Sequence, residues 1–293
     1  MNPAPFTYHK PATVAEAVAL LTQYDDDGAK LIAGGHSLLP VMKLRLAEPA
    51  HLIDLGSATD DVLRAVTLDG DTLRLGALVT HRTLERDATI RTNAPLLAEM
   101  AGHVGDQQVR ARGTLGGTVA HADPAADYPA GLIVLDATIV AQGTDGTREI
   151  PVDQFFLGLL TTALSPDEII TEIRFPVAPA GTGVSYQKVA NQASGYAVIG
   201  VAAQVTLGAD GTASDVRIGV TGATGQAFRA TTVEQALNGQ AIDDTSVTAA
   251  LPGVTDGIDF LEDLSASADY RKRLVHGLIK RAVLEAATRA SAT

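Results

Sequence analysis

The alternation of hydrophobic and polar positions along the chain predicts helices and strands in mixed order, as in an α+β protein. Val14, Ala17 and Leu21 recur at helical intervals behind Thr13 and Glu16, which have the spacing of a capping box. Further helices are expected at 39–46, 80–86, 95–101, 232–237, 245–251 and 268–289. Short apolar runs or strict alternation predict strands at 30–33, 52–54, 73–75, 138–142, 197–207 and 215–220.

Three other stretches bear on how the chain is divided. The apolar residues of 169–175 predict a strand that Pro176 ends, and because proline cannot donate to a ladder we expect this strand at a sheet edge. The run 177–181 has the composition of a linker and predicts a domain boundary near residue 178. The segment 102–126 shows no sustained period, and an irregular stretch of this length is more often functional than idle.

Composition narrows the class of protein. Hydrophobic residues make up 46% and charged residues 19% of the 293 positions, without the roughly 18 uninterrupted apolar residues that a membrane span needs. Residues 1–10 show no basic region followed by an apolar run, so we expect a cytoplasmic protein. The net charge of -12, with no lysine or arginine block, argues against a nucleic-acid partner. The absence of cysteine excludes a cysteinyl flavin link and places any iron–sulfur cluster on another chain.

Two glycine pairs are the strongest candidates for ligand binding. One lies in Ala33-Gly34-Gly35-His36-Ser37, directly after a predicted strand, and the other in Thr114-Leu115-Gly116-Gly117-Thr118. Paired glycines let the backbone approach a ligand with successive N–H groups directed at an anion, and the flanking hydroxyls add donors. Either pair taken singly is also compatible with an ordinary tight turn. No Rossmann fingerprint or Walker loop is present.

The residues after the second glycine pair admit three interpretations. His121, Asp123 and Asp127 could ligate a metal, the carboxylates could bind ligand hydroxyls, or the aspartates could cap turns and helices, which is the commonest role of such residues. Lys188 could face a phosphate or a flavin, although a surface lysine is the simpler interpretation. Tyr196 could cover a ring system or be merely half-buried. Arg110 and Arg112 could pair with a phosphate, although solvated loop residues are the simpler interpretation.

Taken in order, these motifs resemble the FAD-binding medium subunit of the xanthine dehydrogenase family of molybdenum hydroxylases. Within that family the likeness is greatest to the medium chain of aerobic carbon monoxide dehydrogenase. It rests on the two glycine motifs, on the run 112–127, and on the segments 166–170 and 186–188, and it covers essentially the full length. The resemblance implies two N-terminal α/β subdomains of the vanillyl-alcohol-oxidase type, about 1–56 and 57–177. A C-terminal domain with an antiparallel sheet and helices, 178–293, would follow them.

The resemblance also implies where FAD is bound. The glycine motifs would enclose the diphosphate, Asp127 would be a carboxylate at the cofactor, Ile170 an apolar wall, and Lys188 a residue at the flavin end. Xanthine oxidoreductases carry an aromatic residue over the flavin where this chain has Val104, which leaves Tyr196 as a candidate cover. The full set of expected cofactor-binding residues is Leu31, Ile32, Ala33, Gly34, Gly35, His36, Ser37, Leu38, Val104, Thr114, Leu115, Gly116, Gly117, Thr118, Asp127, Ile170 and Lys188.

By the same resemblance, the chain is an oxidoreductase subunit with non-covalent FAD, no metal site and no acid–base residue of its own. Substrate would be hydroxylated at molybdopterin on a large partner chain, and electrons would cross [2Fe–2S] clusters on a small partner chain to this flavin and then to an external acceptor. The assembly would be a dimer of heterotrimers. Alternatives are a stand-alone flavin oxidase, with FAD linked through His36, and an assembly subunit that has lost FAD. The substrate stays open among carbon monoxide, an N-heterocycle such as nicotine, and an aldehyde.

Overall fold

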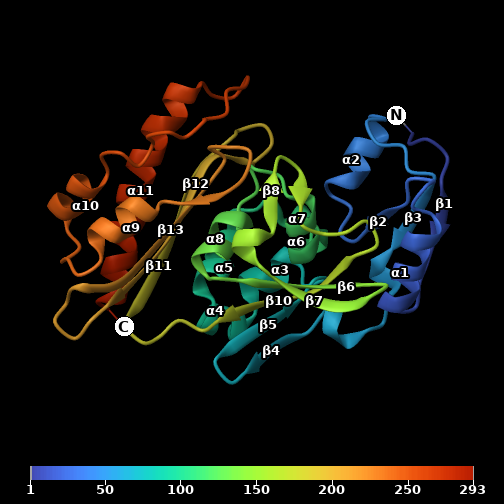
Figure 1. Ribbon diagram of the computed structural model, residues 1–293, viewed down its shortest axis with the longest axis horizontal. Coiled ribbons are helices and arrows are strands. Elements are labelled where there is room, and N and C mark those ends of the chain that lie inside the picture. Colours follow the sequence, from blue (N-terminus) through green and yellow to red (C-terminus); the bar gives the residue numbers. More distant parts are fainter. Residues whose placement is uncertain (1, 293) are drawn as a thin grey trace.

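The computed structural model describes residues 2–292, and these form three units that follow one another across the molecule in chain order (Figure 1). The first unit is a small parallel sheet with two helices. The second is an antiparallel sheet with a group of short helices, and the third is a longer antiparallel sheet covered by the C-terminal helix. None of the helices within residues 2–292 is long and apolar enough to cross a membrane.

The first unit places a loop at the end of a parallel strand. Its strands β1 (Thr7–His9), β3 (His51–Asp54) and β2 (Lys30–Ile32) are ordered β1-β3-β2. Parallel neighbours need crossover connections, and α1 (Val14–Gln23) and α2 (Leu38–Lys43) lie in them. The predicted capping box begins α1, since the Thr13 hydroxyl accepts from the Glu16 N–H at 3.1 Å. The first glycine motif therefore joins the end of β2 to α2.

The second unit is built on the antiparallel order β4-β5-β10-β6-β7. Its strands are β4 (Val66–Asp69), β5 (Thr72–Gly76), β10 (Ile169–Pro176), β6 (Thr138–Gly143) and β7 (Gly146–Pro151), with the small pair β8 (Phe156–Gly158) and β9 (Thr161–Thr162) beside them. Between β5 and β6 the chain forms α3 (His81–Arg86), α4 (Ala88–Asn93), α5 (Pro95–Gly102), α6 (Gln107–Arg112), α7 (Leu115–His121) and α8 (Tyr128–Val134).

The expectation of an edge strand at 169–175 is wrong, because β10 is the central strand of its sheet. Pairing with β6 ends at Arg174, opposite Thr138, so the missing N–H of Pro176 interrupts no bond on that side. Proline therefore limits the length of this strand and not its position. The unbroken burial of residues 169–173 fits a strand with neighbours on both sides.

The third unit is the sheet β11-β12-β13-β14 with α11 on one face. Its strands are β11 (Thr182–Ala190), β12 (Ala197–Leu207), β13 (Ala213–Thr221) and β14 (Phe228–Arg229), and its helices are α9 (Thr231–Leu237), α10 (Asp244–Ala250) and α11 (Ala268–Ala290). The other face packs on α8 of the second unit, so β12 is buried on both faces. Gly183 permits the close contact with α11, because a Cβ there would lie 2.0 Å from the Ala286 carbonyl oxygen.

The segment 102–126, expected to be irregular, contains α6 and α7, and α4 was also missed. Helices of six or seven residues complete fewer than two turns, which is too short to show a helical period in sequence. The helix expected at 39–46 already ends at Lys43, and Arg45 beyond it has a φ of 57°. Tertiary contacts, more than local pattern, therefore shape the chain around the site described next.

Candidate cofactor-binding site

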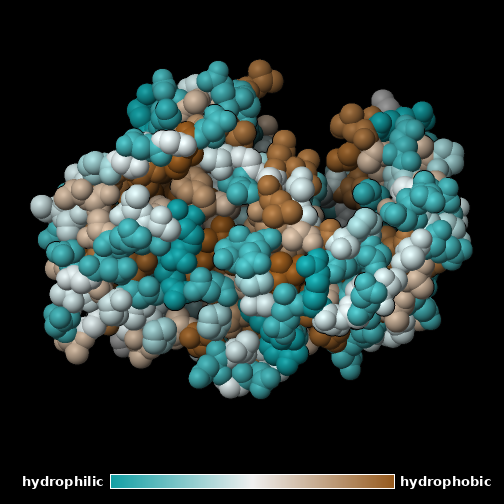
Figure 2. Space-filling view, viewed as in Figure 1, coloured by the Kyte–Doolittle hydropathy of each residue, from teal (hydrophilic) through white to brown (hydrophobic). Residues whose placement is uncertain are grey.

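A cleft of about 660 Å³ lies between the first and second units, and a loop of the third unit reaches its wall. Its volume is within the range of ordinary ligand sites. The space-filling view shows this side of the molecule hollowed between the N-terminal unit and the remainder (Figure 2). Most of the lining comes from residues 30–41, 77–81, 104–128, 169–170 and 194–196, so five segments distant in sequence converge here.

The first glycine motif lines the cleft and carries unpaired backbone donors. Gly35 has a φ of 78°, a left-handed conformation that favours glycine. Within the described part of the chain, the N–H groups of Gly34, Gly35 and His36 have no hydrogen-bond acceptor. Backbone N–H groups rarely stay unpaired in a concave site, and several directed into one space form an anion-binding arrangement.

The second glycine motif is built differently from the expectation. The Leu115 N–H donates to the Val79 carbonyl and the Gly116 N–H to the Ala77 carbonyl, both at 2.9 Å. The Gly117 N–H donates to the Thr114 hydroxyl at 3.2 Å, which begins α7. The prediction that both loops offer N–H groups to an anion is therefore wrong for this loop. The second motif instead contributes hydroxyl groups and, at Gly117, room for a ligand.

The two motifs touch each other through Gly34. A Cβ at this position would lie 2.4 Å from the Arg112 carbonyl oxygen and 2.7 Å from the Gly113 Cα. At Gly117, by contrast, a Cβ would meet the Thr114 hydroxyl at 2.7 Å and otherwise only the Ala33 Cβ at 4.0 Å. Gly34 therefore serves the contact between the loops, whereas Gly117 keeps open the space between them.

A buried ion pair joins the second and third units at the inner end of the cleft. The Lys188 ammonium lies 2.8 Å from Asp127 Oδ1, with the two side chains 2% and 6% exposed. The Tyr186 hydroxyl donates to the same carboxylate at 2.5 Å, and Lys188 also donates to the His103 carbonyl at 3.1 Å. Burial raises the pKa of Asp127, while Lys188 and Tyr186 oppose the rise. The interpretation of Lys188 as a surface residue is wrong.

The carboxylates after the second motif divide into two roles. Asp127 stands at the N-cap position directly before α8, yet its side chain caps no N–H group, so the capping interpretation fails for it. Asp123 does close a turn, accepting from the Ala125 N–H at 2.8 Å. His121 lies 4.0 Å from Asp123, and among residues 2–292 no group of three or more acidic or histidine side chains is placed to hold a metal ion.

Most of the expected site residues line the cleft. Those that do are Leu31, Ile32, Ala33, Gly34, Gly35, His36, Ser37, Leu38, Val104, Thr114, Gly116, Gly117, Thr118, Asp127 and Ile170. Leu115 instead points into the hydrophobic core, and Lys188 lies behind Asp127. Arg110 is a structural residue, since it pairs with Glu85 and donates to carbonyls of the 102–105 loop.

Other lining residues carried no recognisable signal in the sequence. His81 and Tyr128 lie below the second motif, with the Tyr128 oxygen 3.0 Å from His81 Nδ1. Burial lowers the pKa of His81 to about 4, and electrostatic interactions with His36 and Arg110 act in the same direction. A histidine at the start of a helix and a tyrosine after an aspartate are common, and only the fold brings these two rings together.

Tyr196 reaches the cleft from the third unit. It follows a turn in which the Asn191 side chain accepts from the N–H groups of Ala193 and Ser194 at 2.9 and 3.2 Å. Burial raises the pKa of the Tyr196 phenol, and a hydrogen bond with Ser37 opposes this rise. The side chain is still 38% exposed, so an aromatic face at the cleft remains accessible.

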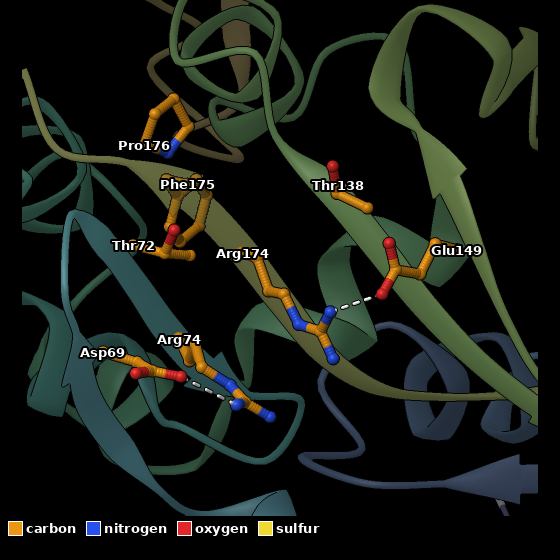
Figure 3. A pocket seen from close by; sticks show the side chains of 8 residues that line it. All are labelled: Asp69, Thr72, Arg74, Thr138, Glu149, Arg174, Phe175 and Pro176. Carbon is orange, nitrogen blue, oxygen red and sulfur yellow. Dashed lines mark hydrogen bonds and ion pairs between the residues drawn. The ribbon is translucent and has the colours of Figure 1, made fainter.

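A second hollow, of about 400 Å³, lies on the second sheet (Figure 3). Its charged side chains are paired with one another: Arg74 with Asp69 at 3.4 Å, and Arg174 with Glu149. Glu172, 5% exposed, contacts both arginines. Each of these charged groups has a partner across the strands, so this hollow offers a ligand no unpaired group comparable to the N–H groups of the first loop.

Comparison with known proteins identifies the class of ligand. Residues 4–178 match the family described as the FAD binding domain in molybdopterin dehydrogenase. The chain belongs to this family. Residues 184–286 match the CO dehydrogenase flavoprotein C-terminal domain. This flavoprotein is 40% identical to the carbon monoxide dehydrogenase medium chain of Hydrogenophaga pseudoflava, over 97% of each chain.

Two further comparisons agree. The flavoprotein is 38% identical to the nicotine 6-hydroxylase medium subunit of Paenarthrobacter nicotinovorans, over 96% of this chain and 97% of that one. A solved structure of the carbon monoxide dehydrogenase from Hydrogenophaga pseudoflava, lacking the Mo-pyranopterin moiety, superimposes with a TM-score of 0.94 at 42% identity, covering 99% of both chains. The expected family, α+β fold, FAD cofactor and oxidoreductase class are confirmed.

The cleft fits FAD on its own geometry. The unpaired N–H groups at 34–36 suit phosphate oxygens, and the gap that Gly117 keeps open lies beside them. The cleft wall is otherwise largely apolar, with Ile170 and Val104 among its residues, and Asp127 is available to a hydroxyl or ring N–H. An acidic chain can hold a diphosphate in this way because neutral donors, and not a cluster of cations, line the site.

Proposed function

We propose that this flavoprotein is the electron-transfer subunit of a molybdenum hydroxylase complex of the carbon monoxide dehydrogenase type. In this function it accepts electrons from [2Fe–2S] clusters on a small partner chain and passes them to an external acceptor, while a large partner chain carries molybdopterin. The bound FAD supplies the redox chemistry, which no side chain of this cysteine-free protein can provide. The observation that carries the proposal is the cleft with its unpaired N–H groups at residues 34–36.

Each wall of the cleft has a distinct task in this proposal. The loop 33–37 and the hydroxyls of Thr114 and Thr118 hold the diphosphate. Ile170 and Val104 form apolar walls, and Tyr196, accessible at the mouth, covers the ring. Asp127, neutralised by Lys188, binds a polar group of the cofactor without adding net charge next to it. No residue is assigned acid–base work, because substrate oxidation belongs to the large partner chain.

The surface beside the cleft supports a permanent partner. Exposed leucines lie in two segments that also contribute lining residues to the cleft: Leu44 and Leu46 after α2, and Leu157 and Leu159 in the β8–β9 hairpin. Leu46 is 76% exposed and Leu159 62%, and brown patches on both sides of the hollow are visible in Figure 2. Clustered apolar residues on a surface mark interaction sites. We propose that partner subunits cover this rim in a dimer of heterotrimers.

The sheets also support a division into domains. We propose an FAD-binding domain at 1–177, with subdomains of about 1–56 and 57–177, and a C-terminal domain at 178–293. The parallel sheet lies in the first part, the second sheet in the next, and the third sheet begins at Thr182 after the short connection from β10.

Two measurements test the function. A visible spectrum of protein from the native source, recorded before and after acid precipitation, should show flavin released into the supernatant. Colour that stays with the precipitate would instead support a His36-linked oxidase, and a colourless native protein would support an assembly subunit without FAD. The same purification should yield a cysteine-rich small chain and a molybdenum-bearing large chain. A single chain that turns over an organic substrate would refute the subunit proposal.

A further inference from the structure

His81 lies directly beneath the second glycine motif and is held there by backbone and packing. It is the first residue of α3, is 3% exposed, and its N–H donates to the Gly113 carbonyl at 3.0 Å. The ring fills the space beside Gly113, where a Cβ would lie 2.6 Å from Nε2. The position of the imidazole relative to the 113–118 segment is therefore fixed.

The neighbouring tyrosine determines which ring nitrogen carries the proton. Tyr128 is fully buried, and within residues 2–292 its hydroxyl has no hydrogen-bond partner other than His81 Nδ1, at 3.0 Å. A buried hydroxyl proton needs an acceptor, so Tyr128 donates and Nδ1 accepts. Burial raises the pKa of Tyr128 and lowers that of His81, which keeps the phenol protonated and the imidazole neutral. The imidazole proton is then on Nε2.

The Nε2–H group faces Thr118. The distance from Nε2 to the Thr118 hydroxyl oxygen is 3.5 Å, at the long end of the hydrogen-bond range. Because the threonine oxygen accepts in this arrangement, its own proton is free to point toward another acceptor. Thr118 lines the cleft, in a motif whose N–H groups at 115–117 are already used. Its hydroxyl is thus one of the few donors that this wall can offer.

We propose that Tyr128 and His81 form a neutral relay that fixes Thr118 as a hydrogen-bond donor to the phosphate oxygens of the bound dinucleotide. The inference rests on the proposed function of the cleft and adds two positioning residues to it. A neutral relay suits this wall because, among the described residues, no arginine side chain lines the cleft. With the opposite tautomer, Nε2 would accept the threonine proton and the phosphate would face a lone pair.

The test compares His81→Leu, Tyr128→Phe and Thr118→Val, each introduced into the native gene so that the chain assembles normally. We expect FAD to dissociate about tenfold more readily from His81→Leu and from Thr118→Val, since each loses one neutral hydrogen bond. The double variant His81→Leu/Thr118→Val should bind FAD no more weakly than Thr118→Val alone, because both changes remove the same donor. His81→Gln, whose amide N–H can replace Nε2–H, should bind within about threefold of wild type.

The ³¹P resonances of bound FAD separate a relay from a merely structural role. They should shift in His81→Leu and Tyr128→Phe while the flavin absorption band stays unchanged. Additive losses in the double variant, or unchanged affinity and ³¹P signals in both relay variants, would overturn the relay. If His81→Leu does not fold, the FAD affinity and ³¹P resonances of Tyr128→Phe and Thr118→Val test the relay instead. Wild-type protein that holds no FAD would refute the proposed function itself, which distinguishes the two failures.

Discussion

Replacing Lys188 by methionine removes the ammonium that pairs with Asp127 but keeps the length of the side chain. The carboxylate then stays in a site where it is 6% exposed, with the Tyr186 hydroxyl as its remaining donor. Breaking a buried ion pair by removing one partner costs about 3–5 kcal/mol of unfolding free energy. Protonation of Asp127, whose pKa burial already raises, limits the loss to the lower part of that range.

The double variant Lys188→Met/Asp127→Asn removes both charges and keeps an acceptor for Tyr186. We expect it to lose about 1–2 kcal/mol, less than either single variant, because no unpaired charge remains buried. Urea unfolding at pH 7 measures these values on FAD-free protein, since bound cofactor would add stability by mass action. The loss of unfolding free energy in Lys188→Met, relative to wild type, should also be smaller at pH 5 than at pH 7. The Asp127 carboxyl has a raised pKa in the folded variant, so the folded state gains stability as it binds the proton.

A matched control is available in an exposed pair. Lys280 lies 2.7 Å from Asp244, with side chains 32% and 76% exposed, and Lys280→Met should change stability by less than about 1 kcal/mol. If the losses of the two single variants at 188 and 127 add in the double variant within about 0.5 kcal/mol, the charges do not couple and the reasoning is refuted.

Three further predictions concern the cleft. Gly34→Ala should destabilise the fold by about 1–3 kcal/mol, because its Cβ would meet the Arg112 backbone. Gly117→Val should leave the chain folded, because its Cβ meets only the end of the Thr114 side chain at short distance, but it should abolish flavin retention. Urea titration and flavin content measure the two effects. The pKa of His81 is about 4 in the folded protein and 6.5 in the unfolded chain, so the unfolded state binds the proton first as the pH falls. Between pH 7 and pH 5 the wild type should therefore lose about 2 kcal/mol more unfolding free energy than His81→Leu. Equal losses in the two proteins would contradict the assignment. Asp127→Ala should weaken FAD binding, while chelators or added divalent metals leave flavin content unchanged; a stoichiometric metal in the purified chain would argue otherwise.

Local sequence determined much of the architecture. The capping box at Thr13 begins α1, and the apolar runs place β2, β3, β6, β12 and β13 within a residue or two of their positions. These features depend on neighbours in the chain: a cap joins residues three apart, and strand periodicity is local. The glycine motifs, read in order with the segments around them, also indicated the family, and most of their residues line the cleft.

The tertiary structure decided the rest, because it depends on partners that are distant along the chain. In the second glycine motif, the Leu115 and Gly116 N–H groups donate to carbonyls of 77–79 and the Gly117 N–H to the Thr114 hydroxyl, so two similar motifs have different roles. From the sequence, Lys188 would be taken for a surface residue, but in the fold its ammonium forms a buried ion pair with Asp127 of another unit. In the same way, the protonation of His81 depends on Tyr128, 47 positions away in sequence. Residue type determined which groups could bind, but only burial and convergence determined which of them are free to do so.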